Sequence, residues 1–211
     1  DQIKNIFPAS KIIVAQNLPR KNSNANSHRT AKLVGEVRLF NIARIAPEKN
    51  LLFALNVLKC VTGNVVFDFY GPIYDNVYLD KCKAVISEMP SNIKATYKGV
   101  ADGNAIFEIM DKYHFLFLPS QGENFGHIIL ESLSTGKPVI ISNNTPWKNL
   151  TKKMAGWDIS IDSLQEFSNT IEKCVQMDNS EYEFQSKCAR AVADVYLNDE
   201  EQLNTKRKLF A

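Results

Sequence analysis

The chain has 211 residues, of which 45% are hydrophobic, and this supplies the core of one large domain or of one domain with a small appendage. The formal net charge is +2 and no long basic run occurs, so we do not expect nucleic acid as a partner. Residues 1–15 contain no signal-peptide core, and no run of about 18 apolar residues occurs, so we expect no transmembrane segment.

Short apolar runs rich in Val, Ile and Phe alternate along the chain with longer segments of helical spacing. The short runs predict strands at residues 11–15, 38–45, 65–70, 94–98, 115–119, 138–142 and 157–161. The longer segments predict helices at residues 50–60, 77–88, 104–113, 125–135, 147–152, 164–177 and 182–196. Repeated strand–helix units of this kind predict an α/β fold with a Rossmann-like, doubly wound parallel sheet.

Two of the expected strands, at residues 115–119 and 138–142, are apolar without polar alternation, which is typical of strands buried on both faces of a sheet. Ligands of such sheets bind at the carboxyl ends of the strands, so the loops after the strands are where we look for a site. The polar segment 20–32 breaks the alternation and is interpreted as a linker or hinge.

The four cysteines are widely spaced and form no Cys-x-x-Cys pair, which argues against a zinc or redox motif. Each lies in a segment that we expect to be helical. Buried, reduced thiols in a reducing compartment are the simplest interpretation of Cys60, Cys82, Cys174 and Cys188. The three histidines, His28, His114 and His127, are scattered and predict no metal site, and His114, at the start of a strand, is interpreted as structural.

The segment 119–131, PSQGENFGHIILE, carries the strongest site signal. It follows a buried strand and opens an apolar helix, and a helix N-terminus attracts anions through its free N–H groups and its dipole. Glu123 and Glu131 are eight residues apart, roughly 12 Å if most of the span is helical. That separation suits gripping two ends of a long ligand better than paired acid–base work on one bond. The alternative is that both carboxylates are simply solvated.

The segment 43–50, ARIAPEKN, carries the second signal. Arg44 lies near the end of a strand, and Lys49 lies near the start of the next helix, where a cation is on the unfavourable side of the dipole. A bound diphosphate would explain both positions, and two surface cations are the alternative. Gly71 and Gly99 also follow strands, where they are either turn glycines or places of close approach to a ligand. Trp147 either flanks the site or packs in the core.

Taken in order, the segments ARIAPEKN, YKG, LPSQGENFGHIILESLSTGKPVIIS and NTPWKNL resemble the C-terminal, donor-binding domain of the group 1 glycosyltransferases. The resemblance runs from about Arg38 to the C-terminus. It implies one half of a GT-B fold and a retaining glycosyltransferase that uses a nucleotide-diphosphate-sugar. Its most specific element is Glu, seven residues, Glu, preceded by a strand ending in Pro-Ser and followed by GKPVI.

The resemblance also implies roles for single residues. Arg44 and Lys49 match the basic pair that contacts the donor diphosphate, and Glu123 matches the acidic residue that faces the donor sugar and assists transfer. Glu131 matches the residue that binds the ribose hydroxyls. The remaining matches are a loop that meets sugar and phosphate and a turn that borders the base: Asn124, Phe125, Gly126 and His127, and Gly99 and Val100. The family uses no metal for the diphosphate, so we expect no cofactor.

Two positions depart from the family pattern. Ala43 stands where a glycine usually precedes the arginine, which adds one methyl group. The segment NNTPWKNL replaces the commoner Gly-x-Pro-Glu run, which leaves the contacts of that loop open and is compatible by analogy with a subgroup acting on surface polysaccharides.

The resemblance predicts an organisation for the chain. We expect an interdomain strand and polar linker at residues 1–32, the nucleotide-sugar domain at residues 33–197, and at residues 198–211 a helix that returns to an N-terminal domain lying outside this sequence. That domain would bind the saccharide or lipid-linked acceptor. We therefore expect the chain alone to bind the donor and to transfer very little sugar. We expect a cytoplasmic location, with peripheral attachment to the inner membrane face as an open alternative.

UDP-, GDP- and ADP-sugars all stay open as donors, and cell-surface polysaccharide synthesis is the expected context. Two rival functions stay open as well: a non-catalytic sugar-nucleotide-binding module, and a sugar-nucleotide epimerase on the same fold. A dehydrogenase is disfavoured because no Gly-x-Gly-x-x-Gly run follows any expected strand.

Overall fold

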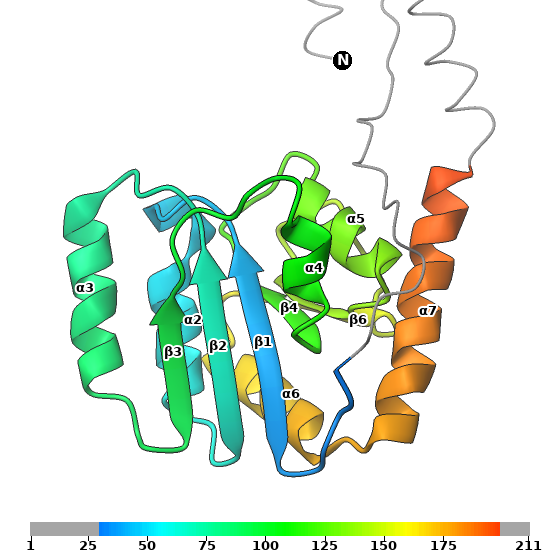
Figure 1. Cartoon of the computed structure of the whole chain (residues 1–211), viewed down its shortest axis with the longest axis horizontal. Helices are drawn as coiled ribbons and strands as arrows, with labels where there is room; N and C mark the ends of the chain where they lie inside the picture. Colours follow the sequence, from blue (N-terminus) through cyan, green and yellow to red (C-terminus); the bar gives the residue numbers. More distant parts are fainter. Residues whose placement is uncertain (1–29, 199–211) are drawn as a thin grey trace, which may run out of the picture.

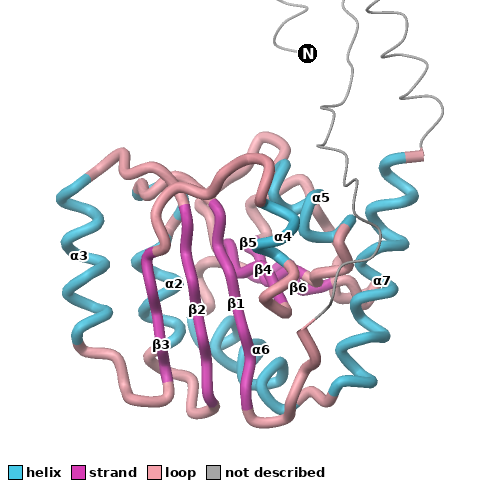
Figure 2. The backbone as a smooth tube through the Cα atoms, viewed as in Figure 1, coloured by secondary structure: helices cyan, strands magenta, loops and turns pink. Residues whose placement is uncertain are grey.

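The computed structural model describes residues 30–198, which form a parallel sheet flanked by helices (Figures 1 and 2). The strands are β1 Glu36–Ile42, β2 Asn64–Tyr70, β3 Ile93–Tyr97, β4 Phe115–Leu118, β5 Val139–Ser142 and β6 Gly156–Ile159. The α-helices are α2 Leu51–Leu58, α3 Asn76–Ser87, α4 Ile106–Met110, α5 His127–Ser134, α6 Leu164–Gln176 and α7 Asn179–Leu197. A short 3-10 helix, η1, covers Pro47–Lys49.

All strand pairs of the sheet are parallel, and the strand order is β3-β2-β1-β4-β5-β6. Every residue of β4 and β5 is buried, as their unbroken apolar sequences predict. The order reverses between β1 and β4, which pair through Leu39 with Phe115 and through Phe40 with Leu116. Ligands of open α/β sheets bind at the carboxyl ends of the strands next to such a reversal.

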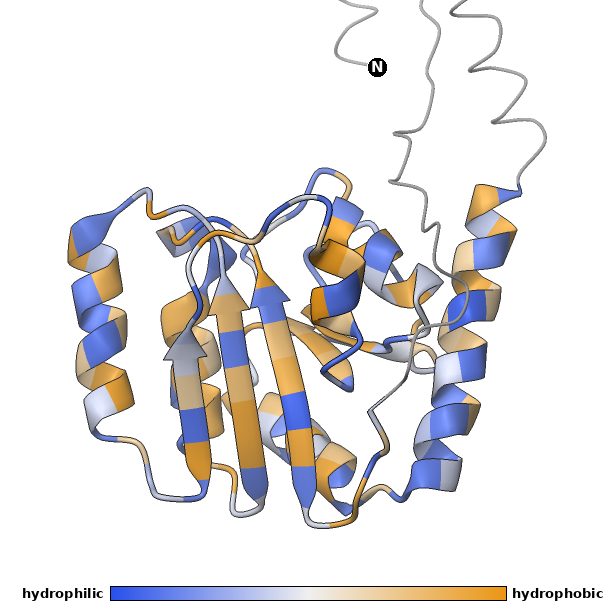
Figure 3. Ribbon diagram, viewed as in Figure 1, coloured by the Kyte–Doolittle hydropathy of each residue, from blue (hydrophilic) through white to orange (hydrophobic). Residues whose placement is uncertain are grey.

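Helices cover both faces of the sheet, and each face has its own apolar core. Helices α2, α3 and α6 supply buried residues to one core together with Phe67, Phe69 and Phe117. Helices α4, α5 and α7 supply the other together with Phe40 and Leu116. In Figure 3 the strands are mostly orange, interrupted by blue bands. The predicted Rossmann-like, doubly wound fold is therefore confirmed. None of the helices within residues 30–198 combines the length and apolar character that crossing a bilayer requires.

The predicted helix at residues 147–152 is wrong, because residues 147–149 have no regular structure and residues 150–154 form turns. Asn149 and Met154 have φ values of 59° and 53°, outside the range of a right-handed helix. The carboxylate of Asp158, in β6, accepts hydrogen bonds from the backbone N–H groups of Asn149 and Leu150, which holds the turn. The helical spacing of the segment is overridden by this contact from the neighbouring strand.

Several other elements are shorter than predicted, among them β1 and α4. The strand expected at residues 38–45 ends at Ile42, so Arg44 lies in a loop after the strand. The helix expected at residues 104–113 is reduced to α4, because the side chain of Asp102 accepts from the Asn104 N–H in a local turn. The strand predicted at residues 11–15 and most of the segment 198–211 lie outside the described residues.

The last residues of the predicted linker, 30–32, pack on the domain, while residues 20–29 lie outside the described part. Lys32 is 1% exposed. Its ammonium donates to the carbonyls of Leu33, Val175 and Met177, the last two at the C-terminal end of α6. A cation there is favoured by the helix dipole and satisfies carbonyls that lack a helical partner. Burial nonetheless lowers the pKa of Lys32.

The four cysteines differ in burial. Cys82 and Cys174 are buried, as expected, and Cys188 is half-buried. Cys60 is exposed, which corrects the expectation of a buried thiol, because α2 ends at Leu58 and Cys60 follows it on the surface.

His114 is fully buried, which confirms its structural interpretation. Its Nδ1 accepts from the Arg38 N–H at 3.0 Å, and its Nε2 lies 3.2 Å from the Ala31 carbonyl oxygen. An Nδ1 that accepts a backbone N–H cannot also carry a proton, so the neutral ring with Nε2 protonated fits this site. Burial is the largest cause that lowers the pKa of His114 to about 4.

We expect this histidine to make the domain sensitive to mild acid. Between pH 6.5 and about 4 the unfolded chain binds a proton at His114 and the folded chain does not, so stability is complete above this window and falls as pH falls through it. The loss at the bottom of the window is about 3 kcal/mol, from the size of the pKa difference. Urea unfolding followed by circular dichroism at pH 7, 6, 5 and 4 measures it.

The matched variant is His114→Asn, whose amide oxygen keeps an acceptor for the Arg38 N–H. Because carboxylates also titrate in this range, the quantity of interest is the difference between the two proteins at each pH. We expect the difference in free energy of unfolding between the unmodified chain and His114→Asn to become smaller as pH falls, because only the unmodified chain has the imidazole that titrates. Parallel curves would contradict a neutral, buried His114.

Candidate functional site

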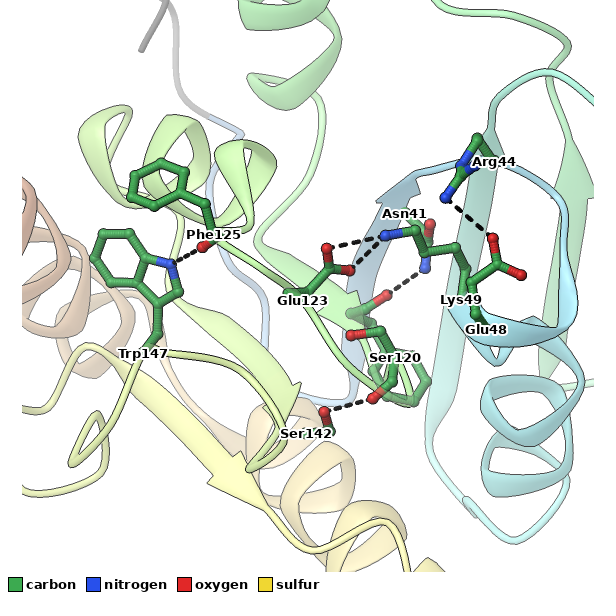
Figure 4. A network of polar contacts seen from close by, with 10 residues as sticks. Asn41, Arg44, Glu48, Lys49, Ser120, Glu123, Phe125, Ser142 and Trp147 are labelled. Carbon is green, nitrogen blue, oxygen red and sulfur yellow. Dashed lines mark hydrogen bonds and ion pairs between the residues drawn. The ribbon is translucent and has the colours of Figure 1, made fainter. Parts of the chain in front are cut away.

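A pocket of about 430 Å³ opens at the carboxyl ends of β1 and β4, where the strand order reverses. Its walls come from the loop and 3-10 helix after β1 and from the loop after β4 with the first residue of α5 (Figure 4). The lining residues are Arg44, Glu48, Lys49, Gly122, Glu123, Asn124, Phe125, Gly126 and His127. The two segments that the sequence marks as strongest therefore face one another.

The loop after β4 is anchored to the β1 side by its own backbone. The Gln121 N–H donates to the Glu48 carbonyl at 2.9 Å, and the Asn50 side-chain amide donates to the Pro119 carbonyl at 3.0 Å. Asn50, with φ of 58°, is also the residue that joins η1 to α2. These contacts fix the distance between the two walls of the pocket.

A second set of contacts anchors the same loop to the β5 side. The Ser142 hydroxyl donates to the Ser120 carbonyl (Figure 4). The Glu123 N–H donates to the Asn144 carbonyl at 3.3 Å. Held from both sides, the loop presents the Glu123 side chain to the pocket in one position.

Gly126 begins α5 in a left-handed conformation, with φ of 78°. A Cβ at this position would come within 2.7 Å of the Ile129 Cδ1, which is the end of a side chain that can shift, so the backbone angle is the main reason for glycine here. Because glycine has no side chain, the N-terminal N–H groups of α5 are not capped by its own N-cap residue. With the dipole of α5 behind them, these groups favour an anion in the pocket.

Lys49 and Glu123 form an ion pair across the pocket. The Lys49 Nζ lies 2.8 Å from Oε1 and 2.9 Å from Oε2 of Glu123 (Figure 4). The two side chains are 16% and 11% exposed, so water screens the pair only partly. The pair joins the β1 wall to the β4 wall and brings together the two charged residues that the sequence places 74 positions apart.

Arg44 lies further toward solvent. Its Nη2 is 3.1 Å from the Glu48 Oε1, and its guanidinium lies over the ring of Tyr74 at 5.1 Å from the centroid. Both side chains of the Arg44–Glu48 pair are nearly half exposed. An exposed pair of this kind contributes little to stability, so Arg44 can change partner at low cost.

An aromatic cluster supports the pocket from behind. The Trp147 Nε1–H donates to the Phe125 carbonyl at 2.7 Å, and the ring of Phe125 lies 5.9 Å from Trp147 and 5.6 Å from Tyr196. Trp147 and Tyr196 are themselves 5.4 Å apart. Trp147 is buried and does not line the pocket, so of its two interpretations the structure favours packing. The cluster ties the site loop to the 146–153 turn and to the end of α7.

Three of the predicted site residues lie outside the pocket wall. Glu131, in the middle of α5, is 5% exposed, which rules out the solvated carboxylate that we kept as an alternative for it. Only its half of the span from Glu123 is helical, because α5 begins at His127. Gly99 and Val100 follow β3, two strands from β1 in the sheet, and Val100 is 68% exposed.

Gly99 is nevertheless connected to the site. Its φ is 80° and no atom lies within 4 Å of the place where a Cβ would be, so the backbone is open to a ligand. Its carbonyl accepts from the Gly71 N–H at 2.9 Å. Gly71 in turn packs so closely on the Ala43 carbonyl that a Cβ would lie 1.8 Å from that oxygen. Gly71 therefore allows two loop backbones to pack closely together, and no ligand approach is needed to explain the glycine.

Glu48 and Gly122 line the pocket, and the sequence analysis gave them no role. Glu48 lies between the two basic residues, four positions after Arg44 and one before Lys49. The sequence did contain a sign of its role: Glu48 is a carboxylate between two basic residues that were expected to bind an anion.

The family model described as Glycosyl transferases group 1 matches residues 23–192 of the chain. A search of the curated proteins gave no match.

Solved structures share the fold at low sequence identity. TarM of S. aureus, a mutant solved with fondaparinux, alpha-GlcNAc-glycerol and UDP, has a TM-score of 0.74 at 19% identity over 99% of this chain and 41% of its own. HepE of Anabaena, solved with UDP and glucose, has 0.68 at 17% identity over 83% and 47%. The catalytic domain of cholesterol-alpha-glucosyltransferase from Helicobacter pylori has 0.63 at 16% identity over 76% and 98%. The chain thus spans less than half the length of the TarM and HepE chains.

The aromatic cluster generates a prediction. Trp147→Phe keeps an aromatic ring at this position and loses the hydrogen bond to the Phe125 carbonyl. We expect the lost hydrogen bond to lower the free energy of unfolding by about 1 kcal/mol, in addition to the effect of the smaller buried ring. Urea unfolding measures this. Trp157→Phe, on the half-buried tryptophan of β6, is the matched control. An equal loss in both variants would show that the hydrogen bond does not hold the loop.

Proposed function

Because this chain belongs to the group 1 glycosyltransferases, we propose that its pocket binds a nucleotide-diphosphate-sugar for retaining transfer to a saccharide or lipid-linked acceptor. Its fold is one Rossmann-like half of the GT-B architecture. The observation that carries the proposal is the convergence of Arg44, Lys49 and the N-terminus of α5 on one pocket at the reversal of strand order.

In the proposed reaction, the bond between the anomeric carbon and the diphosphate oxygen breaks, and the departing oxygen keeps the electron pair. The acceptor oxygen bonds to the same face of the sugar, and its proton passes to the departing diphosphate oxygen. Negative charge therefore grows on the diphosphate, and two cations and a helix N-terminus are arranged to stabilise it. We propose that these groups serve in place of a metal ion and that no cofactor is needed.

Glu123 is proposed to position the donor sugar, because its carboxylate lies in the pocket on the α5 side, next to Lys49, which is proposed to bind the diphosphate. Asn124, Phe125, Gly126 and His127 complete this wall. Glu131 and the Gly99–Val100 turn are proposed to meet the ribose and the base. UDP is the first nucleotide to test, since TarM and HepE were solved with UDP. Two expectations stay predictions: that the protein acts in the synthesis of cell-surface polysaccharide, and that it is located in the cytoplasm.

The first test is calorimetric titration of the chain with UDP, GDP and ADP. We expect one nucleotide to bind, and Arg44→Ala/Lys49→Ala to weaken it on the order of 100-fold, because two charge-assisted contacts are lost. Lys59→Ala/Lys83→Ala removes the same charge from two surface ion pairs elsewhere and is the control. Equal weakening by both pairs of substitutions would contradict the proposed pocket.

The role of Glu123 has its own test. In Glu123→Gln we expect UDP affinity to be kept or raised, and the additional affinity of UDP-glucose, UDP-galactose or UDP-GlcNAc over UDP to be lost. The reason is that the carboxylate is proposed to contact the sugar and not the nucleotide. The ratio of the two dissociation constants in each protein is the measured quantity. An unchanged ratio with every sugar would remove Glu123 from the donor-sugar site.

A further inference from the structure

Both cations of the pocket are paired with carboxylates of the same pocket. Arg44 contacts Glu48, and Lys49 contacts Glu123 (Figure 4). These four side chains therefore carry no net charge when they are ionised, although the site is proposed to bind a strongly charged diphosphate. A diphosphate must compete with a carboxylate for each cation.

The two ion pairs differ in how easily they open. The Lys49–Glu123 pair uses both carboxylate oxygens and is nearly buried. The Arg44–Glu48 pair has one contact of 3.1 Å and side chains that are 47% and 46% exposed. Water screens the second pair and solvates its partners once they separate. Arg44 is therefore the cation that exchanges most readily between a protein carboxylate and a ligand phosphate.

The position of Glu48 is fixed at the backbone and free at the side chain. Its carbonyl accepts from the Gln121 N–H at 2.9 Å, so the residue is part of the frame of the pocket. Its side chain needs only to rotate for the carboxylate to leave Arg44. Tyr74 holds the guanidinium of Arg44 from another side, at 5.1 Å. Arg44 thus has a resting position beside Glu48 and stays near the pocket when Glu48 moves away.

We propose that Glu48 is a selectivity and release residue of the donor pocket: its carboxylate competes with the ligand for Arg44 and disfavours the free nucleoside diphosphate more than the nucleotide-sugar. The inference rests on the proposed function of the pocket. A free diphosphate has a terminal phosphate that ionises a second time near neutral pH, and in the sugar ester this oxygen is blocked. The product therefore carries more negative charge than the donor and is repelled more strongly by a nearby carboxylate.

Competition by Glu48 would favour release of the product over release of the donor. After transfer the sugar is gone, and Glu48 returning to Arg44 replaces one of the product's cation contacts. Departure of the nucleoside diphosphate is then assisted by a group already in the pocket. Because differences in affinity at one site usually reside in the dissociation rate, the effect is expected in the rate at which the product leaves.

The test is Glu48→Gln, which keeps the size of the side chain and the backbone contact to Gln121 and removes the charge. The probes are UDP and UDP-glucose, with GDP and GDP-mannose substituted if the chain prefers guanine. In Glu48→Gln we expect the dissociation constant of the nucleoside diphosphate to fall about fivefold and that of the nucleotide-sugar to fall about twofold. These factors follow from the usual size of exposed charge interactions. We also expect the dissociation rate of the free diphosphate to fall by a similar factor in stopped-flow displacement.

Asp80→Asn is the matched control, because Asp80 forms an exposed ion pair with Lys83, three residues away on α3, and the substitution changes the net charge equally. We expect it to leave both dissociation constants unchanged. Higher salt should reduce the difference between Glu48→Gln and the unmodified chain, since the competing interaction is screened. A purely structural role of Glu48 would not distinguish the two ligands or respond to salt in this way.

The outcomes separate the two proposals. Binding of nucleotide by the unmodified chain, with Glu48→Gln equal or weaker toward the free diphosphate, overturns the role of Glu48 and leaves the pocket intact. Binding that is detected only in Glu48→Gln supports the role of Glu48 and shows how strongly it opposes the ligand. Absence of binding in both proteins overturns this inference together with the pocket.

Discussion

The reversal of strand order between β1 and β4 is the constraint on which the pocket depends. Both strands are central to the sheet and end at the same edge, and the chain leaves them in different directions to reach helices on opposite faces. Two polar loops are thereby brought opposite each other with no helix between them. The charged side chains of the pocket can approach because the buried strands beneath them fix where the loops start.

Within this frame, the Lys49–Glu123 ion pair connects the two walls, and the neighbouring backbone contacts keep them in register. In the proposed anion site, each of the two cations is paired with a carboxylate before any ligand is present. A diphosphate would therefore gain affinity by exchanging partners with these carboxylates. On that proposal, the carboxylates would help to set which anions bind and how quickly those anions leave.

The fold and most of the pocket could be predicted because the signals are local. The apolar runs of β4 and β5 are continuous, and Gly126 stands directly before the apolar residues of α5. Other features depend on residues distant in sequence. The 147–152 segment has helical spacing, and it is the Asp158 carboxylate of β6 that makes it a turn. The burial of Glu131 and the pairing of Glu123 with Lys49 follow from packing that no local pattern records.

The buried Lys32 has a consequence for where this domain begins. By sequence, the residue closes a polar linker, yet its ammonium group fills the interior beside the last turn of α6. A shortened protein starting at Leu33 would lose the ammonium group that links the carbonyls of Val175 and Met177, and would keep only the Gly35 N–H as a donor to Val175. The linker and the folded unit therefore overlap by at least this residue, and any excised version of the domain has to carry it to remain whole.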